Sequence, residues 1–240
     1  MLTYEYGNPA SPVVLIQMVD DHGLEVMESE VEAIQGAVDS FKLVAIKVNS
    51  WNRDLSLWKA PAVFGKEDFG GCAAETLTEV LKLCTDGSKT YFLGGYSLSG
   101  LFALWAAYQT KVFAGIAAAS LLVWFPGFAE FMKGHVIHSG TVYLSLGDKE
   151  ESVKSQVMSK VGDCIREGYA RLTEQGINCT LEWNQGNHFR QPDIRTAKAF
   201  VWVMKNYKES NALKEELIGT PVCAKFAQAQ KEGNNLQQIG

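Results

Sequence analysis

Six short, nearly continuous apolar runs constrain the fold of this chain more than any other feature. They lie at 13–19, 43–48, 91–94, 115–119, 142–146 and 179–183. Apolar runs without polar alternation are typical of strands buried on both faces of a sheet. The stretches between and after these runs predict helices at 25–38, 67–83, 101–109, 153–174 and 192–207. This alternation predicts an α/β fold with a largely parallel central sheet and helices on both faces.

The domain organisation follows from a change in composition near residue 209. The chain has 240 residues, of which 47% are hydrophobic and 20% charged, enough apolar side chains for a sizeable core. From 209 to 240 it turns polar and rich in Gln and Asn, without a strand pattern. We therefore predict one α/β domain over 1–208 and a polar C-terminal extension over 209–240, helical or partly disordered.

Charge, hydropathy and cysteine usage exclude several function classes. The net charge is −5 and basic residues are scattered, which is unlike a nucleic-acid-binding surface. No apolar run reaches the roughly 18 residues that a membrane helix needs, and the N-terminus lacks the pattern of a secretory signal. The five cysteines are odd in number and without C-x-x-C spacing. We expect a cytoplasmic protein with free thiols and no nucleic-acid or membrane partner; the sequence does not indicate an oligomeric state.

The most informative stretch is 91–105, YFLGGYSLSGLFALW. An apolar strand runs through small residues directly into an apolar helix, which is the setting of a nucleophile elbow. Gly95 and Ser99 stand two residues before and after Ser97, where so tight a turn requires small side chains. The pattern predicts Ser97 as a nucleophile at a helix N-terminus. The competing interpretation is a glycine-rich turn without chemistry.

A serine hydroxyl needs a base, and in this kind of fold the acid and then the histidine follow the serine along the chain. Only His188 lies beyond both the elbow and a later strand end that carries an acid. That strand end reads SLGDKEE at 145–151. Related hydrolases show glycine, two residues and then the acid, a spacing that favours Glu150 over the alternative, Asp148. The remaining carboxylates would anchor the loop or cap the next helix.

The oxyanion hole should combine the backbone N–H of Leu98 with one N–H from the loop after the first strand. The second donor is left open between Asp20, Asp21 and His22. The competing interpretation is that the two aspartates cap the following helix, and His22 either lines the pocket or has a structural role. We expect no metal and no cofactor, because the histidines lack ligand spacing and no phosphate loop or dinucleotide fingerprint occurs.

Candidate substrate contacts lie at the carboxyl end of the second strand, where open parallel sheets bind ligands. There the segment 49–58 offers Trp51, Arg53 and Trp58, which would suit an aromatic or carboxylated acyl group. Trp124, after the fourth strand, is a candidate roof of the acyl pocket. The competing interpretation for all of these tryptophans is packing against their own scaffold.

Three separated motifs, GGYSLSG, LGDKE and GNHF, resemble the esterase family of α/β hydrolases that includes esterase D, feruloyl esterases and enterochelin-esterase-like proteins. The resemblance covers roughly residues 10–207. It implies an α/β-hydrolase fold without a large lid and a serine carboxylesterase acting on a small-molecule ester or thioester. By position it makes Ser97 the nucleophile, His188 the base, and Glu150 or Asp148 the acid. Two alternatives remain: a non-catalytic binding protein on the same scaffold, and an acyltransferase that uses the same acyl-enzyme.

Overall fold

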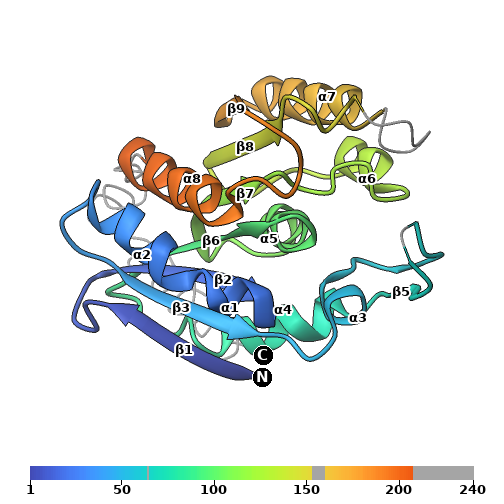
Figure 1. Ribbon diagram of the computed structural model, residues 1–240. Coiled ribbons are helices and arrows are strands. Elements are labelled where there is room, and N and C mark those ends of the chain that lie inside the picture. The colour runs from blue at the N-terminus through green and yellow to red at the C-terminus, as the bar shows by residue number, and fades with distance from the viewer. Residues whose placement is uncertain (64, 153–159, 208–240) are drawn as a thin grey trace, which may run out of the picture. The chain divides into compact units, whose positions relative to one another are not determined.

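A seven-stranded sheet forms the centre of the domain, in the order β1-β3-β2-β6-β7-β8-β9 (Figure 1). The structure, a computed structural model, describes residues 1–63, 65–152 and 160–207. Met1–Tyr207 makes up one compact unit. The extension predicted at 209–240 lies outside the described residues, as does the first part of the helix predicted at 153–174.

All six predicted strands are present and pair in parallel. They are β2 (Val13–Val19), β3 (Lys42–Lys47), β6 (Thr90–Tyr96), β7 (Phe113–Ala119), β8 (Thr141–Gly147) and β9 (Asn178–Asn184). Because strands buried on both faces must be apolar throughout, continuous apolar runs identified the inner strands well. β9 is a half-buried edge strand that also contains Thr180 and Glu182. The predicted fold class, a largely parallel sheet between helices, is confirmed.

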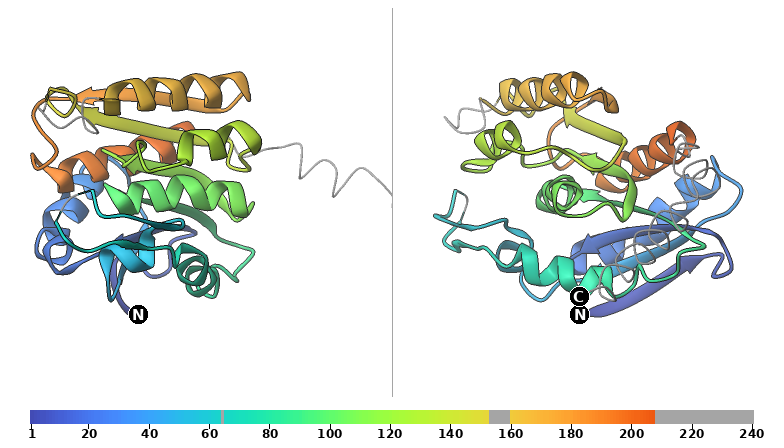
Figure 2. Two further views of the ribbon diagram at one scale, coloured as in Figure 1. Left: turned by 90° about the vertical axis from the view of Figure 1, so that its right-hand side faces the viewer. Right: turned by 180° about the vertical axis from the view of Figure 1, so that it is seen from behind.

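One strand of the sheet was not predicted. β1 (Leu2–Gly7) pairs antiparallel with β3 at the edge of the sheet and is mostly exposed. Since an exposed edge strand needs few apolar side chains, its sequence carries no buried-strand signal. Figure 2 shows this edge at the N-terminus and the opposite edge, where β9 lies beside α7.

Helices cover both faces of the sheet. α2 (Met27–Gln35) and α8 (Pro192–Asn206) pack on one face, and α4 (Ala73–Leu81), α5 (Leu98–Gln109) and α7 (Val161–Glu174) on the other. The prediction of one helix over 67–83 is wrong in its first part. There β5 (Phe69–Gly70) pairs with β4 (Lys59–Ala60), and Gly71 has a φ of +76° that ends regular structure before α4 begins. Unpredicted short helices are α1 (Asp21–Glu25), α3 (Trp51–Leu55) and α6 (Phe128–Gly134). Every helix within the described ranges is too short or too polar to cross a membrane.

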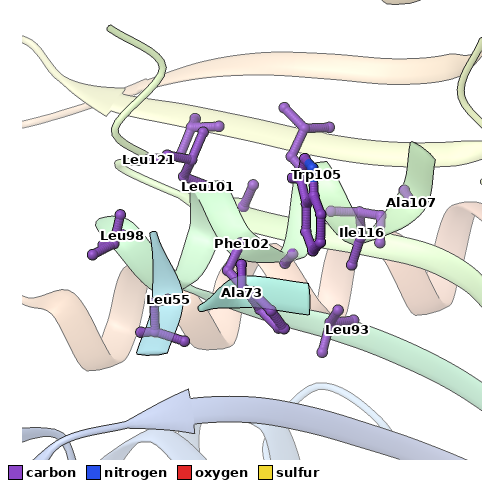
Figure 3. Close-up of a cluster of buried hydrophobic side chains, with 14 of the residues drawn as sticks. Leu55, Ala73, Leu93, Leu98, Leu101, Phe102, Trp105, Ala107, Ile116 and Leu121 are labelled. Carbon is purple, nitrogen blue, oxygen red and sulfur yellow. The ribbon is translucent and has the colours of Figure 1, made fainter. Parts of the chain in front are cut away.

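α5 is buried along nearly its whole length, which explains why its sequence is apolar on all sides. Leu93 and Ile116 of the sheet lie on one side of it, and Leu55, Ala73 and Leu121 lie around it (Figure 3). A helix enclosed in this way has a fixed position, so the residue at its N-terminus is also fixed. That residue is Ser97.

Candidate active site

Ser97 stands alone between the end of β6 and the start of α5. Its backbone has φ 60° and ψ −123°, a conformation that non-glycine residues rarely adopt. Three hydrogen bonds hold it there: its N–H donates to the carbonyl of Ala119 at 3.0 Å, and its own carbonyl accepts from the N–H groups of Leu101 at 3.1 Å and Leu122 at 3.3 Å. The turn therefore presents the serine side chain above the carboxyl edge of the sheet.

The residues two before and two after Ser97, Gly95 and Ser99, are small because the tight turn brings them into contact. A Cβ on Gly95 would collide with the Oγ of Ser99. Ser99, which stands where the G-x-S-x-G motif has its second glycine, is fully buried, and its hydroxyl donates to the carbonyl of Met18 at 2.9 Å. This hydrogen bond ties the first turn of α5 to the end of β2, the strand that leads to Asp20.

His188 lies between Ser97 and Glu150. Its Nε2 is 3.0 Å from the Oγ of Ser97, and its Nδ1 is 2.7 Å from the Oε2 of Glu150. The three side chains come from the β6–α5 turn, the loop after β8 and the loop after β9, so neighbouring parallel strands bring them to one edge. With Nδ1–H donated to the carboxylate, Nε2 is free to accept the hydroxyl hydrogen of Ser97.

The geometry distinguishes the two candidate acids. Glu150 is 2% exposed; its Oε2 contacts His188, and its Oε1 accepts the N–H of Gly147 at 2.7 Å. Asp148 is exposed, and its Oδ1 instead accepts the N–H of Gly186 at 2.8 Å. Asp148 thus anchors the loop that carries His188, which was its alternative role, and Glu150 is the carboxylate that contacts the imidazole.

Arg195, on α8, was not predicted as part of this site. It is 3% exposed, and its guanidinium donates to four acceptors: Tyr96 Oη at 3.0 Å, Ser120 Oγ at 3.1 Å, Glu150 Oε1 at 3.4 Å and the Gln185 carbonyl at 3.0 Å. Its positive charge compensates the buried carboxylate of Glu150. The one sequence signal was its position four residues before Ala199 and eight before Val203, which puts a charge on the apolar face of the helix.

Tyr96 connects this network to the histidine loop. Its hydroxyl donates to the backbone carbonyl of His188 at 2.7 Å and accepts from Arg195. Burial raises the pKa of Tyr96, so the phenol keeps the proton that it donates. The loop that carries His188 is therefore held by Asp148 at Gly186 and by Tyr96 at the histidine itself.

Ser97 and His188 open into a cleft of about 260 Å³, which Asp20, His22 and Trp51 also line. Arg53 and Trp124 are not among the residues that line it. Trp58, the third tryptophan suggested by the sequence, donates from Nε1 to the carbonyl of Pro126 at 2.8 Å and packs against Phe125, so it serves the scaffold. Within the described residues, no group of three histidines, cysteines or acids has the arrangement of a metal site.

The side chains of both aspartates after β2 have structural partners. The Oδ1 of Asp20 accepts the N–H of Gly23 at 2.8 Å and caps α1, while Asp21 forms an ion pair with Lys47. Because a carboxylate cannot donate, only backbone N–H groups of this loop are candidates for an oxyanion hole. Of the three residues left open by the sequence, Asp20 and His22 line the cleft with Ser97 and Asp21 does not. The N–H of Leu98 lies in the first turn of α5, where helix geometry leaves backbone donors without partners inside the helix.

Comparison with known proteins identifies solved structures that share this fold. No family model matches the chain, and no curated protein does. An IroE-like serine hydrolase from Shewanella oneidensis superposes with a TM-score of 0.69 at 15% identity, over 85% of this chain and 75% of that one. A siderophore hydrolase from Aspergillus nidulans gives a TM-score of 0.59 at 19% identity, over 82% and 85%. The domain has the α/β-hydrolase fold.

A third similar structure is an enterobactin esterase from Shigella flexneri, with a TM-score of 0.60 at 12% identity. The match covers 85% of this chain but only 55% of that one. At such identities the likeness concerns the fold, and the fold alone does not decide an activity. The chemistry must therefore be argued from the residues at the carboxyl edge of the sheet.

Proposed function

We propose that this protein is a serine esterase that hydrolyses a carboxylic ester or thioester of a small molecule through an acyl-enzyme. The observation that carries the proposal is the position of His188, hydrogen-bonded to Ser97 on one side and to Glu150 on the other. This is the arrangement that activates a serine hydroxyl in acyl transfer. The likeness in fold to esterases supports the same interpretation.

In the acylation step, the Oγ of Ser97 attacks the carbonyl carbon of the substrate and its proton passes to Nε2 of His188. The developing oxyanion accepts hydrogen bonds from the N–H of Leu98 and, as we propose, from the N–H of Asp20. When the tetrahedral intermediate collapses, His188 returns the proton to the leaving alcohol or thiol. Glu150 holds the tautomer of the imidazole and stabilises the imidazolium without taking its proton.

In the deacylation step, a water molecule enters where the alcohol left and gives a proton to Nε2 of His188 as its oxygen attacks the acyl carbon. The carboxylic acid leaves and Ser97 regains its proton. Because His188 must be unprotonated to act as the base, activity should rise with pH from acidic values. A flat profile between pH 5 and 8 would count against His188 as the base.

The names of the similar structures do not select an acyl group for this chain, since they include a siderophore hydrolase, an enterobactin esterase and a ferulic acid esterase.

We also propose a cytoplasmic location. The four cysteines within the described residues are free thiols, as a reducing compartment allows. Burial raises the pKa of one of them, Cys84, to about 12, so it is unreactive.

The test is the Ser97→Ala variant, assayed with p-nitrophenyl acetate and with a fluorophosphonate probe. We expect kcat/KM to fall by roughly 10⁴-fold or more and covalent labelling to disappear. Ser88→Ala is the matched control, because Ser88 is exposed in the loop before β6, at the strand end opposite Ser97. Folded wild-type protein that neither turns over the ester nor takes up the probe would identify a binding protein instead.

A further inference from the structure

The cleft that Ser97 lines is also lined by two buried polar side chains that the esterase mechanism does not use. They are Gln17 on β2, 5% exposed, and Glu30 on α2, 2% exposed, and both line the cleft. The Nε2 of Gln17 donates to the Oε2 of Glu30 at 3.2 Å. The other oxygen of each side chain, Oε1 in both cases, has no hydrogen-bond partner among the described residues. The part of the cleft that these two buried side chains line, its inner end, thus has two buried oxygen atoms without a hydrogen-bond partner.

Such acceptors are costly when nothing binds them. A buried polar atom without a partner costs about 1–3 kcal/mol, and an unpaired charge costs more. Burial raises the pKa of Glu30 to about 8; the hydrogen bond from Gln17 lowers it, and the carboxylate of Asp193 raises it further. Glu30 is therefore mostly protonated below pH 8, and once it is ionised the pair lacks a positive charge or a group with several donors.

The other acidic side chains that line the cleft would add negative charge. Three acidic side chains line the cleft, Asp20, Glu30 and Asp193; neither lysine nor arginine lines it within the described ranges. Trp51, Tyr96 and Phe189 add aromatic rings. Carboxylates and aromatic faces both attract a cation. A carboxylated acyl group, which Arg53 had suggested, would be repelled here.

We propose that the inner end of this cleft is a subsite for a primary ammonium group of the substrate, bound by the Oε1 atoms of Gln17 and Glu30. An ammonium supplies three N–H donors and one positive charge, so it satisfies both unpaired oxygens and compensates the carboxylates. A neutral hydroxyl has one donor and no charge. The assignment of this group to a substrate rests on the proposed function, but the binding site itself does not.

The experiment measures binding without turnover. Isothermal titration calorimetry compares n-propyl- to n-hexylammonium chloride with the alcohol and the carboxylate of equal chain length, at pH 9, where Glu30 is ionised, and at constant ionic strength, against wild-type protein. We expect the best ammonium to bind at least tenfold more tightly than its alcohol, and the carboxylate not to bind. Glu30→Gln should reduce the ammonium-to-alcohol ratio to near one. Glu32→Gln, the same change at an exposed position of α2, should keep the ratio.

The outcomes separate this proposal from the esterase proposal. An alcohol or a carboxylate that binds wild type as tightly as the ammonium overturns the subsite, as does an unchanged ratio in Glu30→Gln. The wild-type comparison stands even if Glu30→Gln fails to fold. Since Ser97 takes no part in this binding, selective ammonium binding by a protein that hydrolyses no ester would contradict only the proposed function. Ester hydrolysis without ammonium selectivity would contradict only the subsite.

Discussion

Glu150 and Glu30 are both 2% exposed, yet their surroundings differ completely. Glu150 accepts hydrogen bonds from a backbone N–H, from His188 and from the guanidinium of Arg195. Glu30 accepts one hydrogen bond, from the neutral amide of Gln17, and keeps an unpaired oxygen. Burial alone therefore does not define the role of a carboxylate. Its partners decide whether the charge is already compensated or is left to be compensated by a ligand.

The two carboxylates also differ in what holds them. Glu150 belongs to a network that includes α8, the end of β6 and the histidine loop, so its position is fixed before any substrate arrives. This suits a group that must orient an imidazole. Glu30 lies on one helix and forms one hydrogen bond, to a side chain on β2, which suits a group whose partner enters and leaves. The predictions below test this contrast.

The largest effect is expected from Glu150→Gln. The amide keeps the shape of the side chain but can no longer accept the Nδ1–H of His188 as a carboxylate does, so kcat/KM for p-nitrophenyl acetate should fall by roughly 10³- to 10⁴-fold. Asp148→Asn is the matched control, with an expected loss below tenfold, because Asp148 only anchors the loop at Gly186. Equal losses in the two variants would remove the distinction between the two acids.

The second prediction concerns stability and pH at Glu30. Its pKa is about 8 in the folded protein against an ordinary value of 4.5, so the folded state keeps a proton that the unfolded chain releases. The contribution of Glu30 to the free energy of unfolding is therefore greatest below pH 4.5. It falls by on the order of 4 kcal/mol as pH rises to 8. Gln17 and Asp193 are the polar groups that act on it.

Urea unfolding at pH 5, 6.5 and 8 measures this contribution as a difference between wild type and Glu30→Gln. The variant lacks the titrating group, so its stability relative to wild type should increase with pH across this range. Glu32→Gln, exposed on the same helix, should follow the wild-type curve. A difference that stays constant with pH would mean that Glu30 is already ionised and compensated.

The sequence predicted those parts of the molecule that depend on local patterns. Continuous apolar runs identified the six parallel strands, and the small residues around Ser97 identified the tight turn. The edge strand β1 escaped because it buries little. Arg195 and Glu30 were not predicted because their partners lie in other elements: Arg195 contacts Glu150 across 45 residues, and Glu30 on α2 contacts Gln17 on β2. Such contacts leave no spacing pattern. The catalytic roles of Ser97, His188 and Glu150 remain predictions, although the structure brings their side chains into contact.

The third prediction is that Arg195→Met lowers the free energy of unfolding by about 3 kcal/mol, because the buried carboxylate of Glu150 then has no cation beside it. Chemical denaturation measures this loss. The loss should be smaller in the Glu150→Gln background, where no charge remains to be compensated.

A kinetic measurement separates a positioning role of Arg195 from a purely structural one. Without the hydrogen bond from the guanidinium to its Oε1, Glu150 is held less firmly against His188, so kcat should fall about tenfold while KM changes little. An unchanged kcat would leave Arg195 a structural role only.

The smallest effect is expected from Ser99→Ala. The substitution keeps the Cβ that packs beside Gly95 and removes only the hydrogen bond to the carbonyl of Met18. One such bond contributes about 1 kcal/mol, so the free energy of unfolding should fall by that amount. Because the bond also holds the end of β2, and with it the N–H of Asp20, beside the elbow, kcat should fall a few-fold while KM changes little. If the stability decreases and kcat does not, the Ser99 hydrogen bond stabilises only the fold, and the N–H of Asp20 keeps its position without a contact from α5.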